Sequence, residues 1–225
     1  KILLPVFALG VSPFIMQSTE SLLNIAFNSS LQKYGGDLAV GAMTILSSLM
    51  QILTLPITGL TQGAQPIISF NYGAKNTERV RQAFRLMITA ALVFSVAFWA
   101  SVMLFPGMFV MIFNNEAELM GITIWAIRIY LAVGFVMGAQ FACQQTFIAI
   151  GQAKSSLFLA LLRKIILLIP LIYILPNFFE DKVFAVFLAE PVSDTLAVLT
   201  TVSLFAYQFK RLLRQLDNEK AAATH

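Results

Sequence analysis

Charge is scarce in this sequence. Only 12% of its 225 residues are charged, whereas a soluble domain carries about 25% charged residues. The chain is also 58% hydrophobic, and its mean hydropathy is +0.80. Together these values exclude an ordinary soluble domain and predict a protein that resides in a lipid bilayer.

Histidine and cysteine are almost absent as well. Cys143 is the only cysteine, which excludes a disulfide-stapled secreted scaffold. His225 is the only histidine, so neither a histidine-based catalytic triad nor a His/Cys zinc site can be built. The sequence holds no G-x-x-x-x-G-K-[ST] phosphate loop, and ATP therefore cannot drive this chain directly. We expect no catalytic residues, no metal and no cofactor.

Long apolar runs separated by charges dominate the rest of the chain. A transmembrane helix needs about 20 predominantly apolar residues. The runs predict an all-α integral membrane fold, a six-helix bundle over residues 1–216 followed by a cytoplasmic tail at 217–225. The predicted helices occupy residues 2–32, 38–70, 83–112, 117–150, 156–176 and 183–209.

The cations of the chain are distributed unevenly over this topology. Twelve would lie on the side of the 71–85 loop and both chain ends, and three on the other side. The twelve include Arg163 and Lys164, which we assign to one membrane face near the start of the fifth helix. Cytoplasmic loops are rich in Lys and Arg, so both ends of this multi-pass segment are expected in the cytoplasm. The net charge of +4 then reflects topology and not nucleic-acid binding.

The first predicted helix carries an acid deep within the bilayer. A charged side chain at that depth costs about 2.5–3.5 kcal/mol on insertion scales, so an intramembrane acid indicates a functional site. Spacings of three and four place it on one face with several polar residues, which must face protein or water. Helix–helix hydrogen bonding is the alternative role for the amides. This face comprises Pro13, Gln17, Glu20, Asn24 and Asn28.

The sixth predicted helix carries two more acids. Glu190 and Asp194 are four residues apart and share a face. Pro191 removes one helical donor and frees the carbonyl of Phe187. The two carboxylates could hold a small cation or share a proton, and Glu190 could instead be solvated near the outer membrane surface.

Uncharged polar residues form two further candidate surfaces. They would line a cavity or, equally, help neighbouring helices to pack. The second helix provides Gln51, Thr54 and Thr58, and the fourth provides Gln140 and Gln144.

Three stretches of the chain resemble a known transporter family. The string "GLTQGAQPIISFNYGAKNTERVRQAF" at 59–84 is similar to the segment that closes the second helix of a lobe in multidrug and toxic compound extrusion (MATE) transporters. "AIGQAKSS" at 149–156 is similar to the family's turn between the fourth and fifth helices, and "PVSD" at 191–194 resembles its last helix. The likeness covers essentially the whole chain and is nearest to the MepA-like branch.

This resemblance implies a larger protein and a secondary antiporter. MATE transporters have twelve helices in two six-helix lobes, so the chain looks like one lobe without its N-terminal partner. Its charged tail favours the C-terminal lobe. Such proteins export lipophilic, often cationic, drug-like compounds in exchange for H⁺ or Na⁺. Glu20 would match the acid in the family's seventh helix. Where some relatives carry an acid in the tenth helix, this chain has Gln140 and Gln144, which favours H⁺.

Two other functions stay open. A flippase for lipid-linked precursors shares the superfamily's shape but favours cations facing an anionic pyrophosphate, whereas the candidate faces here hold acids and amides. A non-transport membrane assembly subunit needs no polar stripes near the midplane. On the transport hypothesis, a proton and a cationic drug compete for Glu20 while the lobes alternate between inward- and outward-open states.

Overall fold

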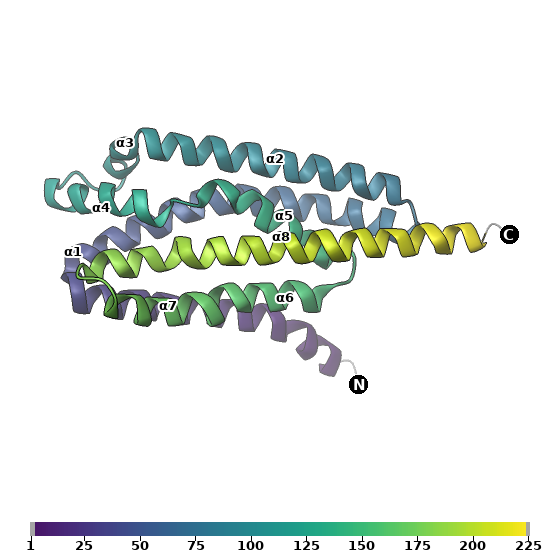
Figure 1. Cartoon of the computed structure of the whole chain (residues 1–225), viewed down its shortest axis with the longest axis horizontal. Helices are drawn as coiled ribbons and strands as arrows, with labels where there is room; N and C mark the ends of the chain where they lie inside the picture. The colour runs from purple at the N-terminus through teal and green to yellow at the C-terminus, as the bar shows by residue number, and fades with distance from the viewer. Residues whose placement is uncertain (1–2, 224–225) are drawn as a thin grey trace. The chain divides into compact units, whose positions relative to one another are not determined.

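The computed structural model describes the backbone of residues 3–223 and the side chains of residues 18–152 and 154–218. Within this part of the chain every regular element is a helix (Figure 1). Most are α-helices; η1 and η3 are 3₁₀-helices and η2 is a π-helix. The elements are α1 (Leu3–Gly73), α2 (Thr77–Leu104), α3 (Pro106–Met111), α4 (Ala117–Tyr130), η1 (Gly134–Val136), α5 (Met137–Ala149), α6 (Ala153–Leu161), η2 (Leu162–Leu168), α7 (Ile169–Ile174), η3 (Leu175–Asn177) and α8 (Lys182–Ala223).

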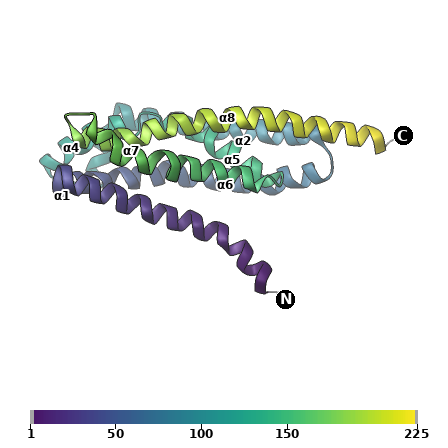
Figure 2. The same ribbon diagram turned by 60° about the horizontal axis from the view of Figure 1, so that its bottom comes forward.

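Several helical stretches of the described chain are long and apolar enough to cross a membrane. Within the described residues, four continuous helical stretches qualify, and a fifth span forms if the pair at 117–130 and 134–149, bent by 51°, counts as one. α1 counts once in this total although it breaks at Gly36, where φ is 63° and ψ is −160°. Only glycine adopts that backbone conformation readily. Figure 2 shows the purple first segment of α1 ending at a sharp turn. The prediction of an all-α membrane bundle is confirmed.

The helices divide between two compact units. The first unit comprises residues 1–48, 106–132 and 160–194, and the second comprises 49–105, 133–159 and 195–225. In the first unit the core includes Leu31, Leu46, Ile127 and Phe187, all fully buried. Trp125 from α4 packs edge-on against Phe187 from α8, with ring centroids 6.2 Å apart.

Close packing of α5 on α2 organises the second unit. The two helices lie side by side in Figure 1. Met137 and Ala91 are fully buried where they meet, in one apolar cluster with Leu53 and Ile57 of α1. Gly138 makes this approach possible, because a Cβ atom there would lie 2.4 Å from the carbonyl oxygen of Ala91. Small residues at such contacts let membrane helices approach closely.

The last helix extends further than the apolar run that predicts it. The predicted sixth span ends at residue 209, but α8 remains helical through Ala223. An apolar stripe continues at three- and four-residue spacing beyond Phe205, to Phe209, Leu213 and Leu216. The rings of Phe205 and Phe209 lie 4.7 and 5.1 Å from that of Phe84 in α2. Beyond that segment Thr77 Oγ1 of α2 donates to Asp217 Oδ1 of α8 at 2.6 Å, so contacts with α2 accompany the longer helix.

The α2–α5 contact gives a prediction about stability. Replacing Gly138 with alanine in the full-length protein forces the two backbones apart, and overpacking of this kind costs about 1–3 kcal/mol. G138A should therefore lose its folded, monodisperse state at a lower temperature than wild type in a heating series read by size-exclusion chromatography. Gly59 is the control, because no atom lies within 4 Å of a Cβ built there. Equal heat stability of G138A and G59A would contradict the packing.

Candidate functional site

Two adjacent cations lie within an apolar helical stretch of the first unit. Arg163 and Lys164 belong to η2, inside a helical stretch at 154–177 that is apolar enough to span a membrane. Their side chains are only 11% and 23% exposed. They are therefore packed among helices and do not lie in an exposed loop, which the assignment to the charges at the membrane face did not foresee. Their ionic partners, described below, explain how the helix accommodates them.

The backbone at these cations is a π-helix, with a wider turn than an α-helix. The amide of Ile169 donates to the carbonyl oxygen of Lys164, five residues earlier. Pro170 follows directly; it has no N–H, and its ring would clash with the carbonyl four residues earlier in a regular helix. Widening the turn relieves this conflict. π-Turns of this kind occur frequently at functional sites.

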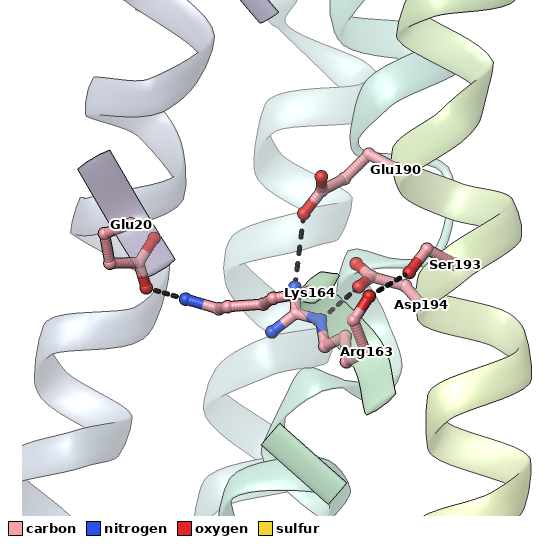
Figure 3. A network of polar contacts seen from close by, with 6 residues as sticks. All are labelled: Glu20, Arg163, Lys164, Glu190, Ser193 and Asp194. Carbon is pink, nitrogen blue, oxygen red and sulfur yellow. Dashed lines mark hydrogen bonds and ion pairs between the residues drawn. The ribbon is translucent and has the colours of Figure 1, made fainter. Parts of the chain in front are cut away.

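Arg163 joins the two acids of α8. Its Nε donates to Asp194 Oδ1 at 2.5 Å, and its Nη2 donates to Glu190 Oε1 at 3.2 Å. Ser193 fixes the backbone as well, because its Oγ donates to the carbonyl oxygen of Arg163 at 2.8 Å. Figure 3 shows these contacts converging from η2 and α8. The guanidinium thus lies between the two carboxylates, in the position where the sequence also allowed a small cation to bind.

Lys164 points away from Arg163 and reaches α1. Its ammonium forms an ion pair with Glu20 Oε1, as the dashed line in Figure 3 shows. The Glu20 side chain is 47% exposed, so it remains accessible from outside the protein. Glu20 is thus half of an ion pair with a residue from another helix, a partner that the spacing of polar residues within α1 could not show.

Glu190 is only partly satisfied by these contacts. The residue is 5% exposed, which excludes the interpretation that it is solvated near the outer membrane surface. Its second oxygen, Oε2, is buried and has no hydrogen-bond partner among the described residues. Asp194, Arg163 and Lys164 lie within electrostatic range of it, as does the buried hydroxyl of Tyr130 from α4. An ionised oxygen without a partner is energetically costly in such surroundings, and a bound proton would remove this cost.

The cluster as a whole carries an uneven charge. Three carboxylates face two cations, which leaves one negative charge when every group is ionised. In a low-dielectric setting a single unbalanced charge attracts a counter-ion strongly. One proton or one cationic molecule would neutralise it. We refer to this set as the charge cluster; it comprises Glu20, Arg163, Lys164, Glu190 and Asp194.

The other predicted residues of the polar face on α1 are only partly covered by the described side chains. The side chain of Gln17 lies outside the described residues. Asn24 is exposed and, in the described part of the chain, no contact links it to the cluster. The structure therefore unites Glu20, Glu190 and Asp194, and the remaining members of this face stay predictions.

The predicted cavity residues belong to the second unit. Gln51 is exposed, whereas Thr54, Thr58 and Gln144 are partly buried. Gln140 is fully buried, and neither polar atom of its side chain has a hydrogen-bond partner in the described region. The neighbouring Gln145 does find one, because its Nε2 donates to Gln65 Oε1 at 2.6 Å. A role in lining a cavity stays a prediction for the five candidates.

Comparison with known proteins adds the family. The family model described as MatE matches residues 13–174. This chain belongs to the MatE family. It is 23% identical over 201 residues to the multidrug export protein MepA of Staphylococcus saprophyticus, and the match covers 88% of this chain but 44% of that protein. A MepA of Staphylococcus haemolyticus is 24% identical over 203 residues, with the same two coverages. The chain thus spans less than half the length of these curated MATE relatives.

Solved structures agree with a single MATE lobe. An inward-facing multidrug resistance MATE transporter of the MOP superfamily gives a TM-score of 0.87 at 20% identity, covering 95% of this chain and 49% of that one. The MATE multidrug transporter DinF-BH gives a TM-score of 0.77 at 35% identity, covering 91% of this chain and 45% of that one. The predicted family, its MepA-like character and the one-lobe fold are confirmed.

Removal of the arginine tests whether the charge cluster exists as described. R163M leaves Asp194 and Glu190 buried without their cation, and breaking a buried ion pair from one side costs about 3–5 kcal/mol. The full-length R163M protein should therefore unfold at a clearly lower temperature than wild type. The triple variant R163M/E190Q/D194N removes the unpaired charges and should recover most of the loss.

The matched control is R79M, because Arg79 is exposed on α2. Heat stability read by size-exclusion chromatography serves for all three variants. An R163M protein as stable as R79M would show that the arginine does not hold the two acids together.

Proposed function

We propose that this chain is the C-terminal lobe of a secondary multidrug exporter, an antiporter that exchanges lipophilic cations for H⁺. Membership of the MATE family supports a transport function, and the MepA relatives are named multidrug export proteins. The charge cluster is the observation that carries the proposal. It supplies one unbalanced negative charge among otherwise apolar helices, which suits alternate binding of a proton and a cationic compound.

Alternating access follows from the need to exchange the two ligands across the membrane. A ligand shifts a conformational equilibrium only by its differential affinity for the two states. In transporters built from repeats, ion and substrate sites lie near the midplane and the halves rock around them. The missing N-terminal lobe would supply the facing half. The positive-inside distribution supports a cell-membrane location with both ends of this segment in the cytoplasm, even with Arg163 and Lys164 reassigned to the bilayer.

Proton coupling fits the chemistry of the charge cluster better than sodium coupling. Hard cations such as sodium are coordinated by several oxygen ligands, by analogy with the oxygen sites of Ca²⁺ and Mg²⁺. In this structure Arg163 forms ion pairs with both Glu190 and Asp194, and Lys164 forms an ion pair with Glu20. In the described part of the chain, the buried and unbonded oxygen of Glu190, Oε2, offers a single ligand, which suffices for a proton and not for a metal-ion shell.

The flippase alternative is less well supported. An anionic pyrophosphate needs a net positive site, and the sequence interpretation placed no cations on the candidate faces. The structure adds two cations, but both are engaged by carboxylates and the charge cluster remains net negative. A membrane assembly subunit without transport activity gives no reason for this unbalanced charge.

Loss of the Glu20 charge tests the export function. In the full-length protein, E20Q removes the accessible carboxylate that would attract a cationic drug. Cells expressing E20Q should retain at least tenfold more tetraphenylphosphonium, a permanent lipophilic cation, than cells expressing wild type. Membrane expression of the two proteins should be equal.

The control for this measurement is E180Q, an identical acid-to-amide change at an exposed residue that precedes α8. E180Q should export at the wild-type rate. Wild-type export by E20Q, with E180Q also active, would remove Glu20 from the transport cycle.

A further inference from the structure

The two cations of η2 differ in how firmly they are held. Arg163 has two carboxylate partners, a backbone contact from Ser193 and an 11% exposed side chain. Lys164 has one ion-pair partner, Glu20, and is about twice as exposed at 23%. Arg163 therefore anchors this turn of η2 to α8, and Lys164 extends from a fixed backbone on a flexible four-carbon stem.

A second possible acceptor for Lys164 belongs to the same charge cluster. Glu190 and Asp194 are both within electrostatic range of it. Asp194 is engaged by Arg163, but Glu190 keeps one buried oxygen, Oε2, without a partner in the described part of the chain. Lys164 is thus ion-paired with Glu20 on α1, while Glu190 on α8 offers a buried oxygen that has no hydrogen-bond partner among the described residues.

We propose that Lys164 is a tethered competitor that makes proton binding and drug binding mutually exclusive. The inference rests on the proposed export function and names the residue that couples its two ligands. When Glu190 carries a proton it no longer attracts the ammonium, and Lys164 stays on Glu20. When Glu190 releases the proton to water, its charge draws Lys164 away and Glu20 becomes free for a cationic compound.

Charge accounting supports the exchange. With all groups ionised the charge cluster has a net charge of −1, from three carboxylates and two cations. A proton on Glu190 brings it to zero with Lys164 on Glu20. A drug cation on Glu20 also brings it to zero with Lys164 on Glu190. Holding both ligands would leave one positive charge, and holding neither would leave one negative charge; both are unfavourable in a low dielectric.

The structure itself corresponds to the proton-loaded arrangement. Lys164 lies on Glu20, and Glu190 Oε2 is bare and buried. A bare buried oxygen costs less when its carboxyl group is neutral. The charged or titratable groups near Glu190 are Arg163 and Lys164 from η2, Asp194 from α8 and Tyr130 from α4. Among these groups, Lys164 is the cation whose ion-pair partner, Glu20, lies on another helix than α8.

The test is a rescue experiment on purified full-length protein, with tetraphenylphosphonium as the probe and equilibrium binding as the readout. E190Q imitates the protonated acid, so Lys164 stays on Glu20. At alkaline pH its affinity for the probe should be at least tenfold below that of wild type. K164M removes the competitor, so its affinity at acidic pH should be at least tenfold above wild type. The double variant K164M/E190Q should bind as tightly as K164M.

The rescue separates competition from structural damage. If Glu190 only stabilised the fold, removing Lys164 as well would not restore binding to E190Q. K154M is the control, since Lys154 is an exposed lysine on the same stretch of helix, and it should bind like wild type. If E190Q fails to fold, K164M alone at acidic pH decides the matter.

The possible results distinguish failure of the lysine switch from failure of the proposed export function. A double variant that binds as weakly as E190Q, or a K164M protein with wild-type affinity at acidic pH, would overturn the lysine switch while export by wild type stands. A wild-type protein that neither binds nor exports tetraphenylphosphonium would overturn the proposed function as well.

Discussion

A charge inside a bilayer needs a partner, and this constraint organises the first unit. Arg163 and Lys164 come from one π-helical turn, yet they bind acids on two different helices, α8 and α1. The buried ion pairs of Arg163 cost desolvation energy, so they are weak evidence of stability alone. Charged residues among apolar helices usually serve a function that requires charge, such as the binding of protons or other cations.

The sequence predicted the fold well because lipid leaves few solutions. Backbone groups must be satisfied within each span, so long apolar runs imply helices, and a glycine pair between two runs implies a turn. Gly36 provides that turn. The bend between α4 and α5 and the extension of α8 to Ala223 were less visible, because tertiary packing decides both. A contact such as Phe84 on Phe205 leaves no trace in local hydropathy.

The candidate site was predicted only in part. Glu20, Glu190 and Asp194 stood out because acids are rare in apolar runs. Arg163 and Lys164 were assigned to a membrane face because cations at the start of a span usually belong to a loop. The missing signal was long-range: two cations and three acids on three predicted helices nearly balance, which is the pattern of internal pairing. Periodicity within one helix cannot show which helices meet.

On the proposed mechanism, one cation replaces one proton in the charge cluster. Calorimetry of tetraphenylphosphonium binding to the full-length protein, repeated in buffers of different ionisation enthalpy, counts the protons released on binding. At a pH where Glu190 begins protonated, the account predicts release of one proton per bound cation in wild type and none in E190Q. Binding to wild type without proton release, or undiminished release from E190Q, would contradict it.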